Sequence, residues 1–183
     1  EQRKEYDQVY GGRKSEDNLK NPLPVINKLK QICNFSTNLK STKLDRLIDI
    51  CKELDAKEEK IIVFSQYVKS LEKINDKLFG ENVFMYHGGL DKDQKDTIIN
   101  NFKTYDGHAI LLMSIKAGSV GLNLQEASTV VLFDRNWNPA IEKQAIARAH
   151  RMGRKEPVHA IKFIVRDSIE ERINDLLTEK NEL

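Results

Sequence analysis

From residue 60 onwards, short apolar runs alternate with segments of helical periodicity, and this alternation constrains the fold more than any other feature. The apolar runs occupy residues 61–64, 83–86, 109–113, 129–133 and 158–165. Continuous apolar runs joined by helices are typical of a parallel sheet that is buried on both faces. We therefore predict an α/β fold, with a mostly parallel sheet of about five or six strands flanked by helices.

Residues that favour helix starts lie between these runs. They are Asp91 with Gln94, Asn138 with Pro139, and Ser168 with Glu171 completing a capping box. Residues 24–56 show helical spacing twice, with a plausible cap at Ser41-Thr42. Two helices are therefore expected ahead of the first strand.

The chain divides into three parts by composition. Residues 1–22 are polar and contain the turn-forming pairs Gly11-Gly12 and Asn21-Pro22, so we expect a flexible lead-in. Residues 23–57 form the helical segment, and residues 58–183 form the main α/β domain. The chain begins without Met, which suggests a piece cut from something larger.

Charge and cysteine content exclude several classes of protein. The 30 Lys and Arg nearly balance the 28 Asp and Glu, which excludes a basic charge spread over the whole chain but allows a local basic stripe. Cys33 and Cys51 have no second Cys or His at ligand spacing, so neither a disulfide framework nor a metal site is predicted. No apolar stretch approaches the roughly 20 residues that span a bilayer. These features indicate no membrane association and a reducing, intracellular setting.

The residues that follow the apolar runs are unusual for plain connectors. In a parallel sheet the ligand site lies beyond the carboxyl ends of the strands, where small hydroxyls, glycines, a Lys and a Trp occur here. The candidates are Ser65, Gln66, His87, Gly88, Ser114, Lys116 and Trp137. Such an edge suits phosphate groups. Trp137, the only tryptophan, could either pack or touch a nucleic acid.

A glycine-containing turn follows the third apolar run, in residues 114–124 (SIKAGSVGLNL). Gly118 and Gly121 would expose backbone N–H groups to an anion, but the same sequence suits a flexible connector. Both interpretations stay open from the residues alone.

Gln144, Arg148 and Arg151 are spaced i, i+4, i+7, which places them on one face of a helix. Two guanidinium groups beside an amide can grip a phosphoryl group, and an arginine so placed can contribute roughly 10³–10⁵ in rate. Basic helix faces are also often simply solvated. The spacing alone does not decide between these two roles.

The chain lacks the motif that holds ATP phosphates in a P-loop ATPase, GxxxxGK[ST], and lacks an acidic strand end for Mg²⁺. Arginines that could hold a phosphoryl group, in a chain without a P-loop, imply a partner that supplies the P-loop. A free-standing α/β module that binds nucleic acid or protein is the alternative. A complete dinucleotide enzyme is disfavoured, because no GxGxxG follows the first strand.

Four long motifs in order carry a resemblance to a known family. They are IIVFSQY (61–67), YHGGL (86–90), residues 111–139 and residues 144–173. Together they resemble the second motor lobe of Swi/Snf-type DNA-dependent ATPases, in helicase superfamily two. The leading segment also looks like the exit from the first lobe, so the resemblance covers nearly the whole chain.

The resemblance implies a RecA-like three-layer domain that closes with a first lobe around ATP and straddles double-stranded DNA. It implies that Arg148 and Arg151 complete the catalytic site, that Gln144 positions them, and that ATP and Mg²⁺ are held mainly by the first lobe. Residues that match the family's nucleotide-proximal turn are Gly118, Gly121 and Asn123. Those that match DNA-facing positions are Ser65, Gln66, His87, Gly88, Ser114, Lys116 and Trp137.

The sequence departs from the family pattern at three positions. Ile115 stands where the family usually has Thr, Ser119 where it usually has Gly, and Arg154 where Gln is common. Ile115 removes a hydroxyl that could meet a phosphate. The short link between residues 33 and 42 favours a prokaryotic member, in the cytoplasm or nucleoid, over a nuclear one.

Overall fold

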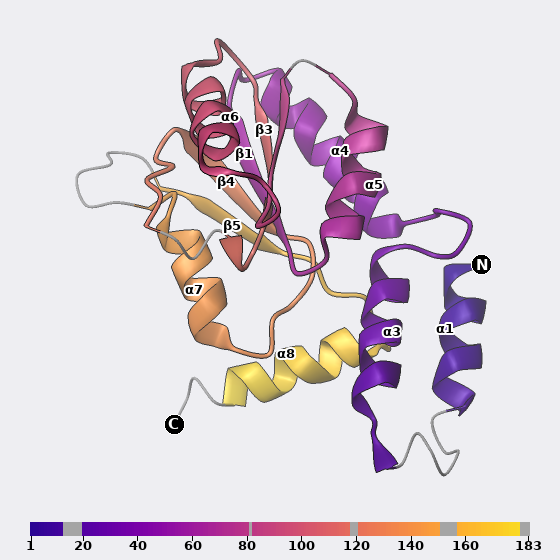
Figure 1. Ribbon diagram of the computed structural model, residues 1–183. Coiled ribbons are helices and arrows are strands. Elements are labelled where there is room, and N and C mark those ends of the chain that lie inside the picture. The colour runs from indigo at the N-terminus through magenta and orange to yellow at the C-terminus, as the bar shows by residue number, and fades with distance from the viewer. Residues whose placement is uncertain (13–19, 81, 118–120, 151–156, 180–183) are drawn as a thin grey trace.

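The computed structural model describes residues 1–12, 20–80, 82–117, 121–150 and 157–179 (Figure 1). Within these ranges a five-stranded sheet has the order β2-β3-β1-β4-β5, and every neighbouring pair of strands is parallel. The strands are β1 (Lys60–Ser65), β2 (Val83–Tyr86), β3 (Ile110–Ser114), β4 (Ala127–Leu132) and β5 (His159–Lys162). The predicted α/β class and parallel sheet are confirmed.

The described helices are α1 (Gln2–Gly11), α3 (Leu23–Asn34), α4 (Thr42–Asp55), α5 (Val68–Leu78), α6 (Lys92–Thr104), α7 (Pro139–Ala147) and α8 (Ile169–Glu179). Some of them cover the two faces of the sheet. One core cluster packs α4 and α5 against the sheet, and another packs α6 and α7 against its opposite face. Alternate residues of β1 serve the two clusters, because successive side chains of a strand point to opposite faces. The result is a three-layer sandwich (Figure 1).

A third, smaller core joins segments that are far apart in the sequence. It contains Tyr6 from α1, with Leu29, Ile32 and Cys33 from α3, and Ile169 of α8 packs against it. Figure 1 shows α1 and α3 side by side, with α8 running towards them. Residues 2–11, expected in a flexible lead-in, are therefore a packed helix.

Several expected helix starts are found. Ser41 caps α4 by accepting from the Leu44 N–H, and the expected capping box at the start of α6 is present. Asn138 caps α7, with Pro139 in its first turn.

The start of α8 and the end of α7 differ from expectation. At α8 the Ser168 hydroxyl accepts from the Glu170 N–H, and Glu171 accepts from the N–H of Asp167 instead of completing a box with Ser168. Helix α7 ends at Ala147, short of the extent expected from the sequence.

Candidate functional site

An open groove of about 420 Å³ lies at the carboxyl edge of the sheet, and we call it the edge groove. The segments that follow β1, β2 and β3 form the groove together with the first turns of α6. Its lining comprises Gln66, Val68, Tyr86, Gly88, Gly89, Lys95, Ser114, Lys116 and Ala117. The parallel register aligns Ser65 of β1 with Ser114 of β3, which brings the residues that follow these strands to one place.

The edge groove has a basic lining. Lys95 and Lys116 line it, and its described lining residues include no carboxylate. Beside it, the His87 ring accepts a hydrogen bond at 3.2 Å from the backbone N–H of Gly89, which holds the turn after β2. A concave surface with two ammonium groups and small residues can receive a phosphate backbone.

Asp134, directly beyond β4, organises the neighbouring part of the edge. Its side chain is buried, and its Oδ1 accepts from the Gln66 backbone N–H at 3.0 Å and from Gln66 Nε2 at 3.1 Å. Its Oδ2 accepts from Asn34 Nδ2 at 2.9 Å and from the Ser65 hydroxyl. A single carboxylate thereby fixes the end of β1 and the position of the Gln66 side chain.

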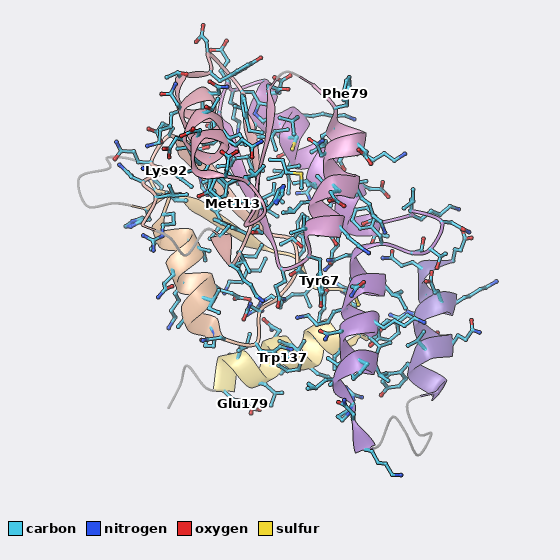
Figure 2. All side chains as sticks on the ribbon, in the orientation of Figure 1. Tyr67, Phe79, Lys92, Met113, Trp137 and Glu179 are labelled. Atoms are coloured by element: carbon cyan, nitrogen blue, oxygen red, sulfur yellow. The ribbon has the colours of Figure 1, made fainter. Side chains whose placement is uncertain are left out.

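Two aromatic rings near this edge, those of Tyr67 and Trp137, contact the same lysine. The Lys30 ammonium lies 5.9 Å from the ring centre of Tyr67 and 5.7 Å from that of Trp137, and donates to the Arg135 carbonyl at 2.8 Å. Burial lowers the pKa of Lys30 below its ordinary value. Trp137 is 42% exposed, so part of the ring that Lys30 approaches also meets solvent. Tyr67 and Trp137 are both labelled in Figure 2.

A buried ion pair lies beneath the carboxyl edge of the sheet. Lys43 of α4 contacts the Glu170 carboxylate of α8 at 2.5 Å, and both side chains are almost fully buried. The Lys43 ammonium also donates to Asn34 Oδ1 and to the Phe133 carbonyl. Burial raises the pKa of Glu170, and the adjacent Lys43 opposes that rise. The network connects α3, α4 and α8 to the chain just before Asp134.

The residues predicted to face a nucleotide lie around the end of α7. Gly121 and Gln144 are exposed, while Asn123 and Arg148 are half-buried. The Leu124 N–H donates to the Arg148 carbonyl at 2.9 Å, so the turn and the helix end are joined through their backbones. Gly118 and Arg151 lie outside the described residues.

Arg148 keeps helical dihedral angles although it follows the last residue of α7. Gln144 and Arg148 are therefore one turn apart, as their spacing predicts. The expected continuation of the same helix face to residue 151 falls outside the described ranges.

The structure brings together only part of the predicted DNA-facing set. Gln66, Gly88, Ser114 and Lys116 line the edge groove, and His87 adjoins it. Ser65 lies beneath the surface with 1% exposure, and its hydroxyl is bonded to Asp134. Trp137 lies with Lys30 and Tyr67 and is not part of the groove lining.

Sequence reasoning missed Lys95. It lies in the first turns of α6, and the capping box of Asp91 and Gln94 fixes the helix start immediately before it. The capping signal was recognisable, but the sequence did not show that this helix start would face the residues after β3.

The described residues contain neither a metal-binding cluster nor a membrane-spanning helix. In the ranges that the structure covers, no group of three or more His, Cys, Asp or Glu side chains could hold a metal ion. No helix in those ranges is long and apolar enough to cross a membrane.

Residues 42–153 match the family described as the helicase conserved C-terminal domain. The chain belongs to that family. This helicase C-terminal domain is also similar to the Sulfolobus solfataricus SWI2/SNF2 ATPase C-terminal domain, with 28% identity and a TM-score of 0.75 over 100% of this chain and 80% of that one. The predicted RecA-like lobe of Swi/Snf type is thereby confirmed.

A second solved structure is the Sulfolobus solfataricus SWI2/SNF2 ATPase core in complex with dsDNA. The domain is 30% identical to it, with a TM-score of 0.78, and the match covers 99% of this chain and 41% of that one.

Curated relatives come from distant organisms. The domain is 36% identical over 164 residues to the DNA repair protein RAD5B of Arabidopsis thaliana, covering 88% of this chain and 13% of the relative. It is 35% identical over 170 residues to an uncharacterized ATP-dependent helicase of Mycoplasma pneumoniae, covering 89% of this chain and 16% of the relative. The helicase C-terminal domain thus spans only a small part of the length of these relatives.

Proposed function

We propose that this domain is the second lobe of an ATP-dependent translocase or remodeller that moves on double-stranded DNA. The observation that carries the proposal is the edge groove, where Lys95, Lys116 and Gln66 meet beyond the carboxyl ends of the strands. The solved SWI2/SNF2 core, which was determined with dsDNA, supports duplex DNA as the ligand. Gln66, His87, Gly88, Ser114 and Lys116 would contact the DNA backbone.

The described residues suit one half of an ATP site. Arg148 can supply a guanidinium to a phosphoryl group, with Gln144 one helical turn before it and Asn123 on the adjoining turn. Arg151 and Gly118 complete the proposed set. Because the sequence contains no P-loop motif GxxxxGK[ST], the ATP phosphates and Mg²⁺ would be held mainly by a first lobe.

The proposed mechanism depends on closure of the two lobes. Closure would carry Arg148 and Arg151 towards the γ-phosphate, where their positive charge offsets the negative charge that develops during transfer. DNA that contacts both lobes favours the closed arrangement, which couples hydrolysis to DNA binding. The same coupling accounts for translocation without a need to separate the strands. We also propose an intracellular location, because a translocase must act where double-stranded DNA is present.

The direct test measures ATP hydrolysis by the complete two-lobe protein with and without duplex DNA. Stimulation by DNA is expected, and its absence would favour the alternative of a binding module that never meets ATP.

Arginine substitutions in the same protein test the catalytic assignment. Arg148→Ala and Arg151→Ala are each expected to lower DNA-stimulated hydrolysis by roughly 10³-fold or more, with little change in melting temperature. Arg46→Ala is the matched control, because Arg46 is an exposed arginine on α4 paired only loosely with Glu53. Normal hydrolysis in the Arg148 and Arg151 variants would reject their catalytic role.

A further inference from the structure

A second groove lies between α3, α5 and the segment around residues 35–37, and we call it the lysine groove. Its volume is about 510 Å³, larger than that of the edge groove. Three lysines line it: Lys28 from α3, and Lys69 and Lys73 from α5. None of the predicted contacts except Gln66 belongs to its lining, so the proposed ATP and DNA sites leave it unassigned.

The charge of the lysine groove is strongly one-sided. Glu5 is the only acidic residue among its described lining residues. Both carboxylate oxygens of Glu5 are already bonded to Thr37, one by its backbone N–H at 2.8 Å and one by its hydroxyl. These bonds lower the pKa of Glu5, so its carboxylate stays ionised, and they orient that carboxylate towards Thr37. The three ammonium groups therefore dominate the field in the groove.

The lysines are placed so that they face one space. Lys69 and Lys73 are four residues apart on α5, which puts them on the same side of that helix. The Lys73 ammonium lies 5.1 Å from the ring centre of Phe35, a residue of the groove lining, and Lys28 stands on the facing helix. Like charges gathered around a cleft repel one another, and an anion between them would relieve that repulsion.

The lysine groove adjoins the edge groove. Gln66 and Val68 line both, so the two hollows are separated only by the start of α5. The first turn of α5 contains no acidic residue, and the Asp134 carboxylate that bonds Gln66 at this junction is buried beneath the surface. A polyanion that occupies the edge groove could therefore extend past Gln66 towards Lys69, and Glu5, already bonded to Thr37, is the one carboxylate among the described lining residues of the two grooves.

We propose that the lysine groove binds the phosphodiester backbone of DNA beyond the segment held in the edge groove. Lys28, Lys69 and Lys73 are the phosphate contacts, and Gln66 lies at the junction. This inference rests on the proposed function, because it extends the same DNA path. Its position next to the edge groove, with Gln66 and Val68 in both linings, favours a nucleic acid over an acidic peptide as the occupant.

The experiment compares DNA binding by variants of the complete two-lobe protein. Fluorescence anisotropy with a labelled duplex, at several salt concentrations, gives the affinity and the slope of log Kobs against log salt. The test variant is Lys69→Gln/Lys73→Gln. The control is Lys52→Gln/Lys57→Gln, which removes two exposed lysines at the end of α4, near the amino edge of the sheet. Equal melting temperatures establish that all variants are folded.

In the test variant we expect the magnitude of the salt slope to fall by about 2, one for each phosphate contact removed, while the control keeps its slope. Adding Lys28→Gln lowers it by about 1 more. A slope equal to that of the control would overturn the inference. So would tight binding of polyglutamate that depends on these lysines while duplex binding does not.

Lys116→Gln in the edge groove separates this inference from the proposed function. If Lys116→Gln weakens DNA binding and the Lys69/Lys73 variant does not, the lysine groove is rejected and the proposed function stands. If neither variant weakens binding, both are rejected. Weakening in both variants supports one continuous track.

Discussion

At the scale of single residues, Asp134 shows how an internal partner changes the role of a predicted contact. Ser65 ends β1 and was expected to face DNA, yet its hydroxyl donates to a carboxylate 69 positions further along the chain. The sequence correctly placed Ser65 at the end of a strand. It could not show that one would satisfy the other, because the pairing depends on β1 and β4 being neighbours in the sheet.

Asp134→Asn tests the structural importance of that carboxylate. The new amide presents a donor where Asp134 Oδ2 accepts from Asn34 and Ser65, and Asn34 cannot simply turn over because its own oxygen accepts from Lys43. We expect a loss of about 2–4 kcal/mol in unfolding free energy, measured by urea denaturation. Asp49→Asn, an exposed change on α4, should alter it by less than about 0.5 kcal/mol. Equal effects of the two substitutions would argue against the role of Asp134.

The two cysteines are predicted to be inert in the folded protein. Burial raises the pKa of Cys33 and of Cys51 from about 9 to about 12. At pH 8 neither thiol should react with a disulfide reagent faster than the protein unfolds. Reaction of native protein at the rate of a free peptide thiol would contradict this.

The same thiols predict a trend of stability with pH. Their folded pKa is raised, so the stabilising contribution is complete below pH 9, where the unfolded thiols are still protonated. It is lost as the pH rises from 9 towards 12, because only the unfolded state then ionises readily. Urea midpoints of wild type and Cys51→Ala should therefore converge over this range.

At the scale of elements, the strands were predicted well and the helix ends less well. Continuous apolar runs identified all five strands to within a few residues, since burial on both faces leaves a strong signal. Helix α1 was missed because residues 1–10 are mostly polar, and a short helix of this kind gains its stability from packing. That packing comes from α3 and α8, whose positions the local sequence does not reveal.

Tyr6 is the buried core residue of α1. Its ring is buried against α3, and its hydroxyl accepts from the Ile169 N–H at 2.7 Å at the start of α8. Tyr6→Ala should release α1, so that hydrogen exchange measured by mass spectrometry shows lost protection in residues 2–11 but not in β3. Tyr6→Phe keeps the ring and removes only the hydrogen bond, at a cost of about 1 kcal/mol. Unchanged protection of α1 in Tyr6→Ala would mean that other contacts hold it.

At the scale of the whole molecule, we propose that a first lobe completes the candidate ATP site. The described residues can offer that site the guanidinium group of Arg148, at the end of α7. The resemblance of four ordered motifs made this expectation possible before the fold was known. The lysine groove was not foreseen, because it depends on α3 lying beside α5 across the end of the sheet.

The 183-residue chain alone should therefore bind ATP weakly and hydrolyse essentially none, with or without duplex DNA. A coupled assay of phosphate release from the purified chain measures this directly. The two-lobe protein assayed under the same conditions is the positive control. Measured turnover by the single chain that increases with DNA would contradict the division of the ATP site between two lobes.

The hydrogen bond from the Leu124 N–H to the Arg148 carbonyl joins main-chain atoms only. A substitution at position 148 removes this hydrogen bond only if it changes the backbone geometry there. This bond therefore holds the backbone of residue 148 whichever side chain the residue carries. Under the proposed catalytic role of Arg148, arginine, lysine and glutamine at this position should start from the same Cα position, so differences in hydrolysis rate between these variants of the complete protein report on the side chain.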